Sequence, residues 1–92
     1  MNHMGMDVKW RKLPSNYSKE VEYNLDIGKF QGTVKTHPDY KHEHPKTPVR
    51  WFVEINISIG HSIRRDGWAP SISKAKEKVE ELLLERIKGS LQ

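Results

Sequence analysis

The chain has 92 residues, among them 16 Lys plus Arg, 12 Asp plus Glu, five His and no Cys, and its formal net charge is +4 at pH 7. A chain of this length folds as one small domain, which excludes two-domain dehydrogenases and eight-stranded barrel enzymes. The absence of Cys excludes disulfides, thiolate zinc sites and thiol nucleophiles, and because we find no secretory signal we expect a cytoplasmic location. No apolar run is long enough to span a membrane, so we expect no membrane partner.

Two segments precede the first clear hairpin. Residues 1–6 show no apolar pattern, and we interpret them as a disordered N-terminus or a cloning scar. Residues 7–92 are then a single domain without internal repeats. Residues 8–13 alternate apolar and basic side chains before Pro14, which predicts a short strand at the edge of a sheet.

Residues 20–36 predict a β-hairpin. Polar and apolar side chains alternate up to residue 27, which is typical of a strand with one buried face. Gly28 and Lys29 then form a two-residue turn, because its first position needs the positive φ that glycine adopts freely. In the resulting register Leu25 lies opposite Gly32, and each apolar residue of the first strand meets an apolar or small residue of the second.

Residues 37–48 contain three Pro and three His without any periodicity, which predicts a loop. The candidate metal ligands in this loop are His37, His42 and His44, because imidazole is a common ligand of zinc. Their spacing matches no known metal signature, and the alternative is a solvated loop. We therefore predict neither a metal nor any other cofactor.

The longest strand is predicted over residues 49–59, where β-branched and aromatic side chains alternate with polar ones, and we place it centrally in the sheet. The alternation directs Trp51 toward the core and Phe52 away from it. A turn at residues 60–61 and a short last strand over residues 62–65 follow.

The C-terminal segment has a different hydrophobic period from the predicted strands. From Ile72 onward apolar residues recur every three or four positions, which predicts a helix with one apolar face, and Ser71 is its expected N-cap. The expected fold class is α+β: a single antiparallel sheet of four or five strands, in the order β-β-β-β(-β)-α, with the C-terminal helix packed on one face.

The sequence carries no signature of catalysis. None of its Ser residues stands in a Gly-x-Ser-x-Gly elbow, and it has no glycine-rich phosphate loop. The carboxylates of the predicted helix alternate with Lys, as on an ordinary solvated helix face. We therefore expect a protein that is not an enzyme and find no evident small-molecule substrate.

Basic residues gather around the predicted start of the C-terminal helix. Lys74 and Lys76 stand where the helix dipole is already positive, and a bound phosphate would relieve that conflict. The alternative is that both lysines simply reach into solvent. We predict a nucleic-acid site, for RNA or DNA, made of Lys74, Lys76, Ser71, Arg64 and Arg65.

The sheet face away from the helix is predicted to be mixed in charge and nearly neutral. Acidic and amide side chains alternate there with Lys35, Arg50 and Phe52. A sheet that enters the DNA major groove is expected to be rich in Arg and Lys on that face. The charge pattern therefore argues against duplex DNA binding by the sheet.

The run Trp-Phe-Val-Glu-Ile-Asn-Ile-Ser-Ile-Gly from Trp51, followed by Gly-Trp-Ala-Pro-Ser-Ile-Ser-Lys-Ala-Lys ending at Lys76, resembles the second half of a double-stranded-RNA-binding domain. The resemblance covers residues 51–88. It implies phosphate contacts from Lys74 and Lys76, with Ser71 as the cap. The first helix of that family is missing here, since the N-terminal residues predict a strand and a turn.

A second hypothesis is a protein-protein interaction or self-association, as in the small accessory proteins that phages and mobile elements encode. Phe52 would be exposed beside Arg50 on the polar sheet face, and Trp10 would lie on a free edge strand. The candidate interface residues are therefore Phe52, Trp10 and Arg50. Of the two hypotheses we favour nucleic-acid binding, because the lysines at the helix start would otherwise lie against the helix dipole. The sequence does not identify the partner or the oligomeric state.

Overall fold

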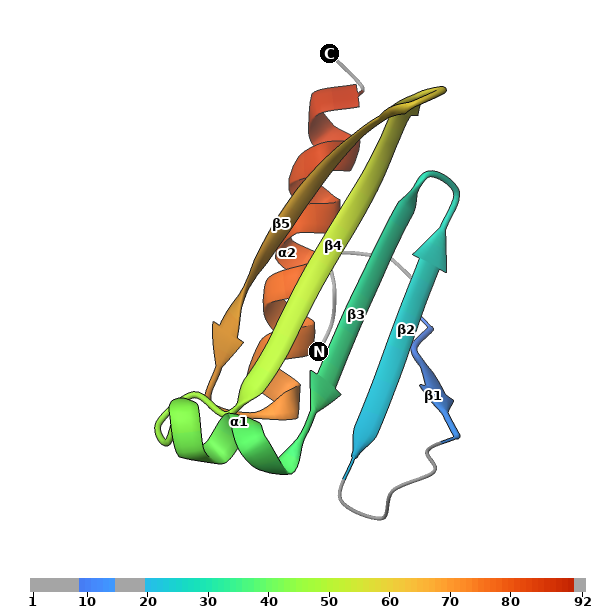
Figure 1. Cartoon of the computed structure of the whole chain (residues 1–92). Coiled ribbons are helices and arrows are strands. Elements are labelled where there is room, and N and C mark those ends of the chain that lie inside the picture. The colour runs from blue at the N-terminus through green and yellow to red at the C-terminus, as the bar shows by residue number, and fades with distance from the viewer. Residues whose placement is uncertain (1–8, 15–19, 91–92) are drawn as a thin grey trace.

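The computed structural model of the chain describes residues 9–14 and 20–90, so our interpretation of residues 1–6 concerns a segment outside the described residues. The described residues form five strands and two helices (Figure 1). In chain order these are β1 (Arg11–Leu13), β2 (Val21–Ile27), β3 (Phe30–Thr36), α1 (Pro38–Glu43), β4 (Val49–Ser58), β5 (His61–Ala69) and α2 (Ile72–Ser90).

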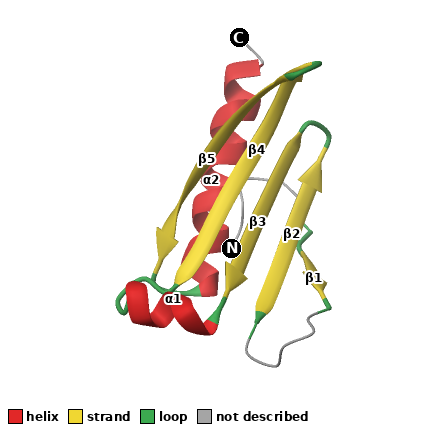
Figure 2. Ribbon diagram, in the orientation of Figure 1, coloured by secondary structure: helices red, strands yellow, loops and turns green. Residues whose placement is uncertain are grey.

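The strands form one antiparallel sheet in the order β1-β2-β3-β4-β5. The long helix α2 packs across one face, against β3, β4 and β5, and lies behind the sheet in Figure 1. Figure 2 shows the same two layers, with α1 at the end of the sheet where β3 ends and β4 begins. The predicted α+β class is confirmed, although the longest strand, β4, is the fourth of the five rather than the central one.

The hairpin of β2 and β3 has the predicted register. Leu25 pairs with Gly32, and the turn residue Gly28 has a φ of 56°. Gly32 is also needed for packing, because a Cβ atom there would lie 2.5 Å from Cγ1 of Val79 on α2. The missing side chain therefore lets the helix approach the sheet closely at this point.

The core lies between the sheet and α2. Apart from Ala69, which lies beyond the predicted end of the last strand, its strand residues belong to the predicted inward rows, and its helix residues belong to the predicted apolar stripe. Trp51 is buried as expected. The buried apolar residues are Leu25, Phe30, Val34, Val49, Trp51, Val53, Ala69, Ala75, Val79 and Leu83.

The predicted loop over residues 37–48 contains the six-residue helix α1, so the prediction of a loop is wrong for that part. The Nδ1 atom of His37 accepts a hydrogen bond from the backbone N–H of Asp39 and caps the helix, while Pro38 begins it with a suitable φ. No residue of α1 is buried. Because the helix has no buried face, its sequence has no apolar period.

The last strand is longer than predicted. β5 has nine residues instead of four, and its turn lies at residues 59–60, one position earlier than expected. Gly67 continues the strand because it pairs with Trp51, and a Cβ atom there would lie 2.6 Å from Cζ2 of the indole. At the opposite edge of the sheet, β1 is confirmed as a short strand, over three residues.

Candidate functional site

The sheet face turned away from α2, here called the open face, carries three rows of neighbouring side chains on β3, β4 and β5. The strand pairing defines these rows as Lys35, Arg50 and Trp68, then Thr33, Phe52 and Asp66, then Gln31, Glu54 and Arg64. Because β5 runs past the predicted end at residue 65, it adds Asp66 and Trp68 to this face. Extending the predicted last strand from residue 65 to residue 69 would have placed both on this face.

Phe52 is half-buried in the middle of the open face. Its cross-strand neighbours, Thr33 and Asp66, have shorter side chains, so the ring stands above them. The amine of Lys35 lies 5.7 Å from the centre of the ring. The predicted outward orientation of Phe52 is therefore confirmed, and its ring lies beside a cation.

A hollow of about 300 Å³ surrounds this ring. Three of the lining residues, Lys35, Arg50 and Arg64, are cationic residues of the open-face rows and one, Asp66, is acidic, so the charge of the hollow favours an anionic ligand. The hollow is lined by Lys35, Arg50, Phe52, Val53, Arg64, Arg65 and Asp66.

Two ion pairs cross the open face. Arg50 Nη2 lies 2.9 Å from Asp66 Oδ2, which holds the guanidinium in place. Arg64 lies 3.6 Å from Glu54, but its side chain is 78% exposed, and such exposed pairs contribute little free energy. Lys35 has no ion pair within the described part of the chain. Arg64 and Lys35 can therefore turn toward a ligand at little cost.

Trp68 anchors α1 and the residue after it to the end of the open face. The His44 ring stacks on the indole with centroids 3.7 Å apart and an angle of 17°, and Tyr40 meets it edge-on at 5.0 Å. The guanidinium of Arg50 lies 5.2 Å from the same ring. Sequence reasoning missed this cluster, because it depends on α1 and on the full length of β5.

The predicted cap of α2 is confirmed. Ser71 Oγ accepts a hydrogen bond of 3.1 Å from the backbone N–H of Lys74, and the Ser71 carbonyl accepts another from Ala75. The amine of Lys74 lies 3.6 Å from Glu77, and its side chain is 63% exposed. Lys74 therefore faces solvent with a weak partner from the next turn.

Lys76 has a different environment from Lys74. Its amine lies 3.8 Å from the centre of the Tyr23 ring and 5.6 Å from that of Trp10. A cation held over aromatic rings is stabilised by their negative faces. Lys76 is thus directed at Tyr23 on β2 and at Trp10, which precedes β1, and these contacts contribute to the packing of α2 on the sheet.

The five residues predicted as one nucleic-acid site are not all brought together. Arg64 belongs to the open face, opposite the face that α2 covers, whereas Ser71 and Lys74 lie at the start of α2. Arg65 pairs with Val53, so it belongs to the row of β5 residues that faces α2. β5 is the edge strand of the sheet. The strand pairing therefore separates Arg64 from the helix-start lysines.

Trp10 belongs to the other side of the sheet. Its Nε1 donates a hydrogen bond of 2.8 Å to Glu80 Oε2 on α2, and its ring packs against the core. Of the three predicted interface residues, Phe52 and Arg50 share the open face, whereas Trp10 ties the start of the sheet to the helix.

The three histidines of the segment after β3 have three separate environments. His37 caps α1, His42 lines a pocket beside that helix, and His44 stacks on Trp68. Among residues 9–14 and 20–90, no three His, Asp or Glu side chains are grouped as a metal site would need.

The chain matches no protein-family model, and searches of curated proteins and of solved structures find no match either. The resemblance to double-stranded-RNA-binding domains therefore stays a prediction. Within the described residues, no helix is long and apolar enough to cross a membrane.

Proposed function

We propose that the protein is a non-enzymatic module that binds single-stranded nucleic acid on the open face of its sheet. The observation that carries this proposal is the half-buried Phe52 ring in a hollow that Lys35, Arg50 and Arg64 line from the same face of the sheet. Single-strand binders combine aromatic rings, on which bases stack, with basic groups that follow the phosphates. Phe52 would take a base, while Lys35 and Arg64 would take the flanking phosphates.

The mixed charge of the open face favours a single strand over a duplex. Glu54 and Asp66 interrupt the basic groups, and each is paired with an arginine. A duplex presents phosphates over a broad surface and hides the faces of its bases, so it could not use Phe52. An unpaired base can lie flat on the ring, and its backbone needs only the nearest cations.

The basic start of α2 is the second surface to test for the same function. Lys74 is exposed there, in the first turn of a helix that has no acidic residue in that turn. Lys76 is held over Tyr23 and Trp10 and would have to leave those rings to reach a phosphate. Because only one of the two helix-start lysines is available to a phosphate, the open face is the better-supported binding surface.

The test is the binding of a labelled single strand of about 12 nucleotides, followed by fluorescence anisotropy at about 50 and 200 mM salt. We expect binding that weakens with salt, and a loss of about tenfold in Phe52→Leu because stacking is lost. Lys74→Gln is the matched control and should bind like the unchanged protein. Salt-independent or absent binding would remove the proposal, and a loss in Lys74→Gln alone would move the site to the helix start.

A second candidate function is self-association through β5. Its outer edge has no strand partner among the described residues, and the tip before it carries Ile59, which is fully exposed, and Ile57, which is 44% exposed. Light scattering over a range of protein concentrations tests this, and a monomer throughout would remove it.

A further inference from the structure

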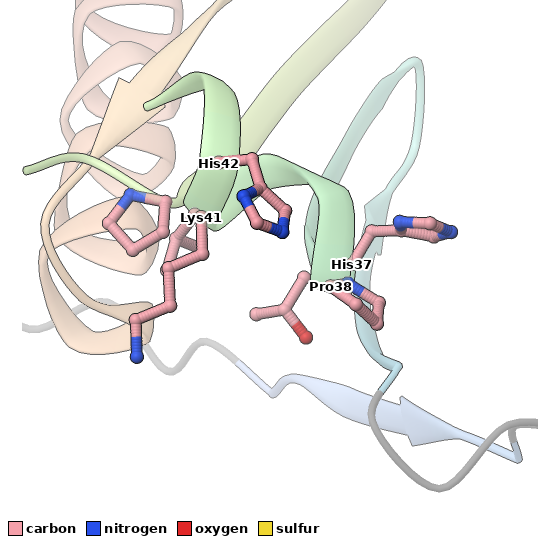
Figure 3. Close-up of a pocket in the computed structure, with 7 residues that line it drawn as sticks. His37, Pro38, Lys41 and His42 are labelled. Atoms are coloured by element: carbon pink, nitrogen blue, oxygen red, sulfur yellow. The ribbon is translucent and has the colours of Figure 1, made fainter. Parts of the chain in front are cut away.

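A second pocket, of about 560 Å³, lies between α1, the end of β3 and the start of β4 (Figure 3). It shares no lining residue with the hollow of the open face. Its volume is in the range of sites that hold small organic molecules. The lining residues are Thr36, His37, Pro38, Lys41, His42, Pro48 and Val49.

The polar lining of this pocket donates hydrogen bonds and contains no carboxylate. Lys41 and His42 are both exposed, and neither side chain makes an ion pair or a hydrogen bond within the described residues. Figure 3 shows the Lys41 side chain extended along one side of the pocket, with its amine directed away from the His42 ring. Because the Lys41 side chain is exposed and has no ion pair within the described residues, it can rotate toward an anionic group that is bound beside His42.

Thr36 adds a third donor. Its Oγ1 accepts a hydrogen bond of 3.1 Å from the backbone N–H of Val21, so the hydroxyl hydrogen remains for a ligand. His37 is already in use, because Nδ1 accepts the Asp39 N–H and Nε2 lies 3.4 Å from Glu20. Its ring points outward, away from Lys41, in Figure 3. His37 therefore serves as part of the wall.

The remaining lining is apolar and rigid. Pro38, Pro48 and Val49 provide ring carbons and methyl groups, and Val49 is buried by the core behind it. Small-molecule sites commonly combine such apolar walls with a few convergent polar groups. We propose that this pocket binds a small organic anion, in which a phosphate or carboxylate is joined to an apolar ring, with Lys41, His42 and Thr36 holding the anionic group.

The proposal is independent of nucleic-acid binding and is tested by amide chemical shifts in the full chain. The probes are phenyl phosphate, benzoate, inorganic phosphate and phenol, which separate the anionic from the apolar part. We expect shifts at Thr36, Lys41, His42 and Val49 with phenyl phosphate or benzoate, and weaker binding of inorganic phosphate and of phenol. The stronger of phenyl phosphate and benzoate identifies which anion the pocket prefers.

The double change Lys41→Gln with His42→Gln should weaken phenyl phosphate or benzoate binding about tenfold or more, because charge-assisted hydrogen bonds are lost. Lys46→Gln is the matched control, since Lys46 is exposed in the same segment but does not line the pocket. A thermal melt verifies that the exposed changes leave the fold intact. Shifts centred elsewhere, an unaffected double variant, or phenol binding as tightly as the two anions would overturn the proposal.

Discussion

The amine of Lys76 lies 3.8 Å from the centre of the Tyr23 ring, so a cation near the start of α2 is in contact with an aromatic side chain on β2. The ring of Trp10, which precedes β1, lies 5.6 Å from the same amine, and its Nε1 donates a hydrogen bond to Glu80. Together these side chains join the edge of the sheet to α2. A lysine that sequence analysis assigns to phosphate binding therefore has a structural contact of its own.

Replacing Lys76 should lower stability more than it lowers nucleic-acid binding. Lys76→Gln removes the contacts with Tyr23 and Trp10, and we expect a loss of about 1 kcal/mol in the free energy of unfolding, as for a partly desolvated cation–π pair. Lys74→Gln, which breaks only an exposed ion pair, should cost a few tenths of a kcal/mol. Urea denaturation measures both. Equal stabilities of the two variants would contradict the structural role of Lys76.

Gly67 should tolerate no side chain. Gly67→Ala places a methyl group 2.6 Å from the indole of Trp51, which is buried and cannot move aside freely. We expect a loss of about 1–3 kcal/mol, in the range of overpacked cores. Ser62→Ala, at an exposed position of the same strand, is the control. An unchanged melting temperature in Gly67→Ala would mean that β5 does not pair with β4 over residues 66–69.

The cap of α2 predicts a difference between two neighbouring serines. Ser71→Ala removes the acceptor of the Lys74 N–H and should cost about 1 kcal/mol. Ser73→Ala changes an exposed side chain in the first turn and should cost far less. Thermal unfolding of the two variants compares them directly. A larger loss in Ser73→Ala would show that the helix begins elsewhere.

Two histidines, His42 on α1 and His44 just after it, should differ in how much they contribute to stability. His44→Ala removes a ring stacked on Trp68 and should destabilise the protein by about 0.5–1.5 kcal/mol. His42→Ala removes an exposed ring and should leave stability unchanged. Hydrogen exchange at the amides of α1 should rise only in His44→Ala. Similar exchange in both variants would contradict the anchoring of this segment by Trp68.

The parts of the fold that sequence analysis predicts correctly are those with a strict period. The hairpin of β2 and β3 has an alternating pattern and a glycine at its turn, so a shift of one residue would expose every apolar side chain. The apolar stripe of α2 and its Ser71 cap are similarly local. Each of these features is decided by residues that are close together in the chain.

The parts that sequence analysis missed depend on residues that are far apart. Asp66 and Gly67 look like the end of a strand, and the need for glycine there comes from Trp51 on β4. The helix α1 buries no residue, so its sequence has no apolar periodicity from which a helix could be predicted. The partners of Lys76 lie on segments that precede it by more than fifty positions, and no local rule connects them.

The most direct measurement of the central claim is a map of amide chemical shifts in the presence of a saturating single-stranded oligonucleotide. If the open face binds the strand, the largest shifts should fall on β3, β4 and β5, around Lys35, Phe52 and Arg64. A set of shifts confined to residues 71–78, or no shifts at all, would contradict the claim that Phe52 and its neighbouring cations form the binding surface.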